Sequence, residues 1–240
     1  MLAHALAERG ENADLSYAGR VAQPRTQPIA VRIGGFGGVP GLVRYLHAHA
    51  VTHLVDATHP FAAQMSGNAI IAAAHAGIPL LALTRPPWHP VAGDRWHSVA
   101  DIGAAVAALE GPPKSVMLAL GRMHLAQFSA QAQHHYILRL VDAPSAPPEL
   151  PQHTIIVSRG PFDVDADTAL MRQHRVDIVV AKNAGGTGAQ AKLHAARLLG
   201  LPVVMVQRPM IAARREAGNV AEVLQWFDHS DAGSGTERGV

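Results

Sequence analysis

Residues 177–199 read DIVVAKNAGGTGAQAKLHAARLL, and this stretch decides the fold class. After its first residue the run 177–181 is wholly apolar, which is typical of a strand buried on both faces of a sheet. Residues 182–187 form a glycine-rich loop, and 188–199 have the pattern of a helix. A buried strand, a tight loop and a helix in this order are the repeating element of parallel α/β sheets.

Strand and helix patterns alternate in the same way along the whole chain. We therefore expect an α/β protein with two Rossmann-like, doubly wound parallel-sheet domains. Gly111-Pro112-Pro113 is the best linker candidate, so the domains are predicted at 1–111 and 112–229, followed by a disordered tail at 230–240. The other expected strands are 13–17, 29–33, 52–57, 79–83, 115–120, 135–141, 154–157 and 202–206, and the other expected helices are 2–9, 39–49, 60–76, 99–109, 123–131, 163–174 and 219–228.

The composition excludes several classes of protein. Of the 240 residues 48% are hydrophobic and 16% are charged, which suits a folded core and not a disordered chain. No apolar run reaches the roughly 18 residues of a membrane helix, and no export signal opens the chain, so we expect a cytoplasmic protein. The chain has no cysteine, which rules out disulfides and thiolate sites. The net charge of +2 comes without a basic block, and the 15 histidines lack metal-ligand spacing, so neither a nucleic-acid face nor a metal site is expected.

The glycine-rich loop is a candidate anion site. Gly186, Gly188 and Ala191 fit the pattern G-x-G-x-x-G/A between a strand and a helix. Glycines allow close approach of the backbone, and the start of a helix offers free N–H groups to an anion. A simple tight turn is the alternative, but Lys182 and Lys192 add positive charge and favour anion binding.

A second candidate follows the expected strand 13–17. In a dinucleotide-binding domain an acidic residue at this place binds the ribose of NAD, whereas an arginine accommodates the 2′-phosphate of NADP. Gly19 and Arg20 occupy the place, which fits NADP and not NAD, and an ordinary surface arginine is the alternative. Arg208, after the strand 202–206, is the rival position in the C-terminal domain.

Other polar residues follow strands in the remaining loops. Asp56-Ala57-Thr58-His59-Pro60-Phe61 comes directly after one strand. Thr58 is a candidate cap for a helix that starts at Pro60, and His59 either binds a phosphate or carboxylate or simply faces solvent. Single arginines follow three more strands, at Arg85, Arg122 and Arg159.

Taken in order, these blocks resemble the precorrin-6A reductases of cobalamin biosynthesis. The resemblance runs over residues 2–209, and its most specific parts are D-A-T-H-P-F and K-N-x-G-G. It implies two Rossmann-like domains with ligands in the cleft between them, and reduction of a double bond in precorrin-6A, or its cobalt form, to the 6B product with NADPH as hydride donor. The supporting blocks are Gly34-Gly35-Phe36-Gly37-Gly38, Gly121-Arg122, Ser158-Arg159-Gly160-Pro161-Phe162 and Arg208-Pro209.

The resemblance and the loop chemistry together predict the site residues. The macrocycle is an anionic polycarboxylate, for which arginine and lysine are suitable partners. His59 and Lys182 are candidate proton donors, with water or a substrate group as the alternative. The predicted cofactor-binding residues are Gly19, Arg20, Thr58, His59, Pro60 and Phe61, and the predicted substrate-binding residues are Arg85, Arg122, Arg159, Lys182, Asn183, Gly185, Gly186 and Lys192.

One departure from the family pattern bears on the cofactor. Members of the family begin with a strand and a G-G-T-type loop, whereas this sequence begins inside the first helix. Loss of that central strand divides a Rossmann sheet into two halves, so we expect a start upstream or weak cofactor binding. Two other hypotheses are an S-adenosylmethionine-dependent methyltransferase of the same pathway and a non-catalytic protein that binds an anionic ligand.

Overall fold

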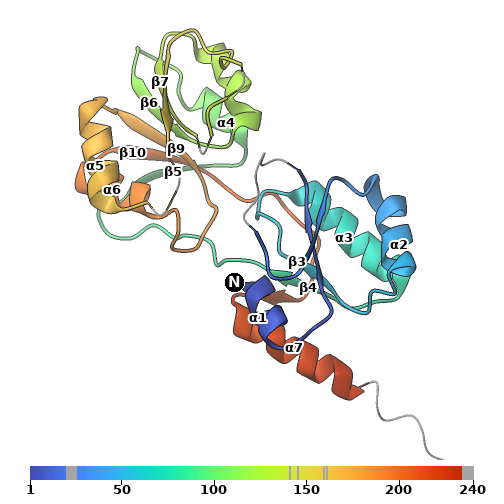
Figure 1. Cartoon of the computed structure of the whole chain (residues 1–240). Coiled ribbons are helices and arrows are strands. Elements are labelled where there is room, and N and C mark those ends of the chain that lie inside the picture. Colours follow the sequence, from blue (N-terminus) through green and yellow to red (C-terminus); the bar gives the residue numbers. More distant parts are fainter. Residues whose placement is uncertain (20–25, 141, 145, 159, 161, 234–240) are drawn as a thin grey trace, which may run out of the picture. The chain divides into compact units, whose positions relative to one another are not determined.

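The computed structural model describes residues 1–19, 26–140, 142–144, 146–158, 160 and 162–233 (Figure 1). The chain divides into two compact units. Unit 1 contains Met1–Thr84 together with Met210–Val240, and unit 2 contains Arg85–Pro209. Every strand pair among the described residues is parallel, which confirms the predicted α/β class with Rossmann-like sheets.

Unit 2 is built on a six-stranded sheet with the order β5-β10-β9-β6-β7-β8. The order reverses between β6 and β9, which makes this pair the switch point of a doubly wound sheet. Ligands of such sheets bind where the strands on either side of the switch point end. The strands are β5 (Arg95–Val99), β6 (Ser115–Ala119), β7 (His135–Leu140), β8 (His153–Val157), β9 (Ile178–Lys182) and β10 (Pro202–Val206).

The core of unit 2 lies on both sides of its central strands. Val179 of β9 pairs with Met117 of β6 and with Val203 of β10, and all three are buried. Helices α5 and α6 pack against each other, as do α4 and η1 (Figure 1). Cover on both faces explains why these strands are apolar throughout. The helices are α4 (Ile102–Ala107), the 3-10 helix η1 (Arg122–Gln131), α5 (Val164–Gln173) and α6 (Ala191–Leu198).

Unit 1 holds two separate parallel sheets. One consists of β1 (Asp14–Tyr17) and β2 (Ala30–Ile33), and the other has the order β11-β4-β3. Within the described residues β1 and β3 do not pair. The second sheet comprises β3 (Leu54–Asp56), β4 (Leu80–Leu83) and β11 (Glu216–Ala217).

Two helix pairs form the cores of unit 1. Leu42, Leu46 and Ala72 are buried where α2 meets α3, and Leu54 of β3 packs against them. On α7, Val223 and Trp226 are buried with Leu81 and Ala217 of the sheet. An ion pair between Arg9, which follows α1, and Asp228 joins α1 to α7. The four helices are α1 (Leu2–Glu8), α2 (Gly38–Ala48), α3 (Ala63–Ala76) and α7 (Val220–Gly233).

The unit boundaries differ from the predicted break at residue 111. The chain leaves unit 1 after Thr84, and β5 joins the unit 2 sheet by pairing with β10. The chain returns after Pro209, and β11 joins the unit 1 sheet by pairing with β4. The prediction that residues 1–111 form one domain is corrected because strand pairing, and not position in the chain, decides which unit a segment belongs to.

Some element predictions were wrong in detail. The sequence analysis missed β5, an exposed edge strand with the polar sequence RWHSV, and β11, which has only two residues. The expected helix 99–109 is shorter, because residues 95–99 form β5 and α4 starts at Ile102. Residues 230–233, which the sequence analysis placed in the tail, belong to α7, which continues to Gly233, and the rest of the predicted tail lies outside the described residues. No helix within the described ranges is long and apolar enough to cross a membrane.

Candidate functional site

The loop between β9 and α6 depends on two glycines with left-handed backbone. Gly185 has φ +69°, and a Cβ there would lie 2.1 Å from the carbonyl oxygen of Pro86. Gly186 has φ +72°, and a Cβ there would lie 2.6 Å from Cδ of Arg85. The positive φ favours glycine at both positions, and at Gly185 the backbone of Pro86 also leaves no room for a side chain. This loop follows β9, one of the two strands at the switch point.

Asn183 and Trp88 hold the same loop against the segment that enters unit 2. The Asn183 side chain is buried; its Oδ1 accepts from Trp88 N at 2.8 Å, and its Nδ2 donates to Trp88 O at 3.0 Å. Trp88 Nε1 donates to Gly186 O at 2.7 Å. The amide of Asn183 thus bonds to protein backbone, so its contribution to a site is to fix the loop.

Arg208 fastens the loop from the segment that leaves unit 2. Its Nε donates to Asn183 O at 2.9 Å, and its Nη2 donates to Arg85 O at 2.7 Å and to Ala184 O at 3.2 Å. The sequence analysis weighed Arg208 as a partner of a 2′-phosphate. In the structure its guanidinium ties the glycine-rich loop to the incoming chain at Arg85.

Lys192 lies behind the loop and is almost fully buried. Its Nζ donates to Ala189 O and sits 5.0 Å from the ring centroid of Trp88. Burial, and to a lesser degree the Arg139 guanidinium, lower the pKa of Lys192 to about 8, while Asp167 opposes the shift. Asp167 forms a buried ion pair with Arg139, and burial raises the pKa of its carboxyl against the pull of Arg139. Lys192 therefore adds positive potential beneath the loop.

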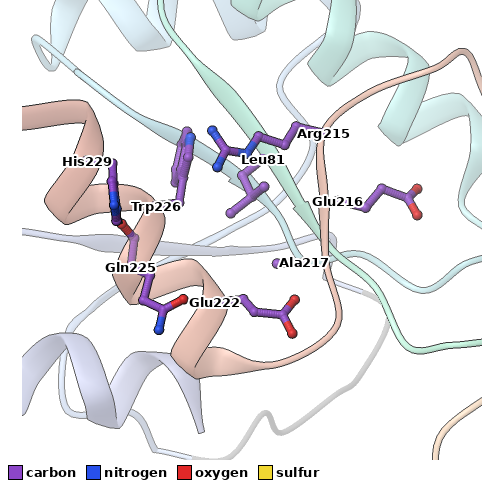
Figure 2. Close-up of a pocket in the computed structure, with 8 residues that line it drawn as sticks. All are labelled: Leu81, Arg215, Glu216, Ala217, Glu222, Gln225, Trp226 and His229. Atoms are coloured by element: carbon purple, nitrogen blue, oxygen red, sulfur yellow. The ribbon is translucent and has the colours of Figure 1, made fainter. Parts of the chain in front are cut away.

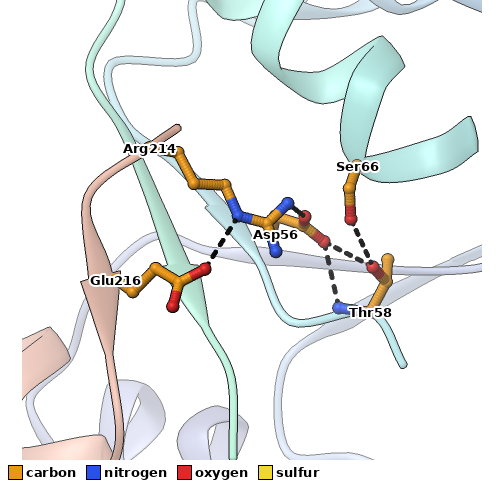
Figure 3. Close-up of polar contacts among 5 residues, drawn as sticks. All are labelled: Asp56, Thr58, Ser66, Arg214 and Glu216. Atoms are coloured by element: carbon orange, nitrogen blue, oxygen red, sulfur yellow. Dashed lines mark hydrogen bonds and ion pairs between the residues drawn. The ribbon is translucent and has the colours of Figure 1, made fainter. Parts of the chain in front are cut away.

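In unit 1 the loop after β3 is organised around a buried carboxylate, Asp56 (Figure 3). Asp56 Oδ1 accepts from Thr58 N at 3.1 Å and from Thr58 Oγ1 at 2.7 Å, and Oδ2 accepts from Arg214 Nη1 at 2.9 Å. Thr58 Oγ1 lies 3.2 Å from Ser66 Oγ on α3. The prediction that Thr58 caps α3 is wrong, because α3 begins at Ala63 and the Thr58 hydroxyl is used by Asp56.

The remaining predicted residues fall at the ends of other strands. In unit 1, Gly19 follows β1 with φ +75°, and exposed His59 accepts at Nδ1 from Phe61 N at 3.2 Å. In unit 2, exposed Arg122 opens η1 directly after β6, the strand beside β9, and Lys182 is the last residue of β9. Pro60 is buried within the unit 1 loop. Two predicted residues, Arg20 and Arg159, lie outside the described residues.

A pocket of about 450 Å³ also opens in unit 1, away from these loops (Figure 2). It lies between α7 and the strands β4 and β11, and none of the predicted site residues lines it. Its lining residues are Leu81, Arg215, Glu216, Ala217, Glu222, Gln225, Trp226 and His229. Across the part of the chain that the structure describes, no three His, Asp or Glu residues are grouped so as to hold a metal ion.

The sequence analysis missed the residues that support the two loops. Asp56 stands inside a motif that it quoted, but the partner Arg214 is 158 positions away in the chain. Trp88 and Asp167 were likewise not singled out. No local pattern marks such residues, because their roles depend on which distant segments pack together.

Comparison with known proteins gives the family. The model of the family "Precorrin-6x reductase CbiJ/CobK" matches residues 1–228. The chain belongs to the precorrin-6x reductase family. This result confirms the resemblance found in the sequence and supports the reductase hypothesis over the methyltransferase alternative.

Similar proteins carry the same description. A precorrin-6A reductase from Rhodobacter capsulatus is 54% identical over all of this chain and 94% of its own length. One from Rhodococcus erythropolis is 45% identical over 94% of this chain and 91% of its own length. A cobalt-precorrin-6A reductase from Methanothermobacter thermautotrophicus is 31% identical over 71% of this chain and 60% of its own length.

A solved structure agrees with the fold. The CobK precorrin-6A reductase matches with a TM-score of 0.91 and 54% identity, over 95% of this chain and 91% of that chain. The match therefore includes residues of both units.

Proposed function

We propose that this precorrin-6x reductase reduces one double bond of the precorrin-6A macrocycle to give the 6B form, with NADPH as hydride donor. The observation that carries the proposal is the cationic, glycine-rich loop at the switch point of unit 2 in a chain of this family. A polycarboxylate substrate is bound by cationic side chains, and the glycines allow the backbone to approach the substrate closely.

The residues of unit 1 fit a nicotinamide cofactor that carries a 2′-phosphate. Residues 16–19 at the end of β1 carry no carboxylate that would repel this phosphate. Gly19, at the turn after β1, allows the backbone to pass close to a ligand. We assign cofactor binding to Gly19, Arg20 and the loop Thr58–Phe61. When bound, NADPH supplies the hydride.

The residues of unit 2 fit the anionic macrocycle. We assign substrate binding to exposed Arg85 and Arg122, to Lys182 and to the backbone of Gly185 and Gly186, with Arg159 as a further predicted member. Lys192 adds positive charge close to the loop, and Asn183 holds the loop in place through its hydrogen bonds to Trp88. An arginine binds a carboxylate with two parallel hydrogen bonds, which orients the substrate as well as holding it.

Reduction of the double bond also requires a proton at the second carbon. We assign this proton to His59 or Lys182, since both lie at the ends of strands whose loops we assign to ligands. The imidazole of His59 is exposed and receives a hydrogen bond at Nδ1 from Phe61 N. Nε2 is therefore the nitrogen that would carry and deliver a proton.

The identities of the relatives favour one form of the macrocycle as substrate. The similar proteins named precorrin-6A reductase are 41–54% identical to this chain, and those named cobalt-precorrin-6A reductase are 27–33% identical. We therefore propose the metal-free macrocycle as substrate.

Anaerobic turnover with purified precorrin-6A tests the whole proposal. We expect a product heavier by two hydrogen atoms with NADPH, a much slower reaction with NADH, and one deuterium in the product from NADPH labelled at the transferred position. Reaction of the cobalt form in preference to the metal-free form would overturn the substrate assignment. Absence of turnover with NADPH bound would favour the non-catalytic anion-binding hypothesis, and methyl transfer from S-adenosylmethionine would overturn the reductase.

A further inference from the structure

Arg214 stands two residues before β11, on the segment through which the chain returns to unit 1. The strand register explains how it reaches the loop after β3. Ala82 of β4 is paired with Asp56 on one side and with Glu216 on the other. Ala82 N also donates to Arg215 O at 2.9 Å, which fixes the backbone just after Arg214. Arg214 thus approaches Asp56 across β4.

The Arg214–Asp56 contact is a buried ion pair. The Arg214 side chain is 8% exposed and that of Asp56 only 1%. A more exposed carboxylate, Glu216, lies 3.5 Å from Arg214 Nε on the other side (Figure 3). A charge buried to this degree needs its partner, since water cannot solvate it after the partner is removed.

The Arg214–Asp56 ion pair acts on the residues after β3 because Asp56 is hydrogen-bonded to Thr58. Oδ1 of Asp56 accepts both the backbone N–H and the hydroxyl of Thr58, so the chain turns sharply at the end of β3. Because the Thr58 hydroxyl has one proton and donates it to Asp56, the Ser66 hydroxyl must be the donor in its contact with Thr58. The chain of hydrogen bonds therefore runs in one direction, from α3 through Thr58 to Asp56.

We propose that Arg214 is a positioning residue for the cofactor loop 57–61. Arg214 holds the Asp56 carboxyl in place through the buried ion pair, and Asp56 in turn holds Thr58 and the residues that follow it. The inference rests on the proposed function, because it takes this loop to be part of the NADPH site. A residue of the returning segment, remote in sequence, thereby sets the geometry of the loop.

The test compares Arg214→Gln, Arg214→Lys and a matched control, Arg9→Gln. Arg9 also pairs with a carboxylate in unit 1, but on the exposed contact between α1 and α7. All variants are measured below their melting temperatures, with circular dichroism to establish that they are folded. Two readouts are used: NADPH affinity and KM, and hydrogen exchange of the backbone amides of residues 57–62.

For Arg214→Gln we expect a rise of roughly 10- to 100-fold in the Kd and KM for NADPH, the size expected of a misplaced binding group, with a much smaller change in the KM for the macrocycle. We also expect faster exchange at residues 57–62 and unchanged exchange in α5. Arg214→Lys should show smaller changes in both readouts, because lysine keeps the positive charge but lacks the planar guanidinium group. Arg9→Gln should match the wild-type chain in both.

The two readouts separate this inference from the function on which it rests. If the wild-type chain binds no NADPH, but Arg214→Gln still loosens residues 57–62, then the cofactor assignment is wrong and the positioning role stands. Unchanged exchange at 57–62 in folded Arg214→Gln would overturn the positioning role. A folded Arg214→Gln with wild-type NADPH affinity, in a chain that binds NADPH, would overturn its link to the cofactor.

Discussion

The loop after β9 in unit 2 and the loop after β3 in unit 1 are fixed by different physical means. The unit 2 loop depends on shape, since Gly185 and Gly186 adopt angles and approaches that other residues cannot. The unit 1 loop depends on charge, since a buried carboxylate and a buried guanidinium hold it. In both cases an arginine of the returning segment, Arg208 or Arg214, is the distant support. One segment thus stabilises two loops by two kinds of interaction.

The largest loss of stability is expected in the unit 1 loop, which is held by charge. Asp56→Ala leaves the Arg214 guanidinium without its buried partner, with the more exposed Glu216 still 3.5 Å from Nε, so the free energy of unfolding should fall by about 3–5 kcal/mol. Urea denaturation measures this loss. In the double variant with Arg214→Gln the loss should be smaller than the sum of the single losses, because both variants remove one interaction. Strict additivity would show that the two side chains do not interact.

The next largest loss of stability is expected in the unit 2 loop, which depends on its glycines. Gly185→Ala places a methyl group 2.1 Å from Pro86 O at a positive φ, which should cost about 3 kcal/mol and displace the loop. Urea denaturation and macrocycle affinity report the two consequences. Gly188→Ala is the matched control, since its Cβ would meet nothing within 4 Å. Equal effects of the two substitutions would show that the loop is not limited by shape.

The hydrogen bond from Trp88 to the loop predicts a smaller effect. Trp88→Phe keeps an aromatic ring in the core but leaves Gly186 O without the indole donor, so stability should fall by about 1–2 kcal/mol. The measurement is again urea denaturation. Macrocycle affinity should weaken while NADPH affinity stays unchanged, because the contact belongs to the unit 2 loop. Weakened affinity for NADPH alone would place the cofactor, and not the macrocycle, on this loop.

The buried lysine is expected to make the stability of the chain depend on pH. The folded-state pKa of Lys192 is about 8, below its ordinary value of 10.5, so the unfolded chain binds the proton more tightly. The cost of burying the charge is therefore present below pH 8 and is relieved as the pH rises through 8 toward 10. The stability of the wild-type chain relative to Lys192→Met should increase over that window. A constant difference in denaturation free energy between pH 7 and 10 would contradict a lowered pKa.

Much of the fold and part of the site could be predicted from local sequence. Apolar runs such as 178–181 and the helices between them predict parallel sheets, because burial on both faces selects those residues. Gly185 and Gly186 stood out because few residues tolerate a tight turn between a strand and a helix. The motif 56–61 and the loop 182–192 were enough to identify the family, because their residue types and spacing are specific in themselves.

Tertiary structure alone decided how these pieces are supported. The sequence could not reveal that β5 joins the sheet of unit 2 and β11 that of unit 1, because short or polar edge strands gain their stability from pairing and not from their own residues. Nor could it reveal that Arg214 lies beside Asp56. This contact depends on the register in which β3 and β11 both pair with Ala82 of β4. Local residue patterns report the burial of each segment, whereas the partner of a buried charge depends on which strands lie side by side.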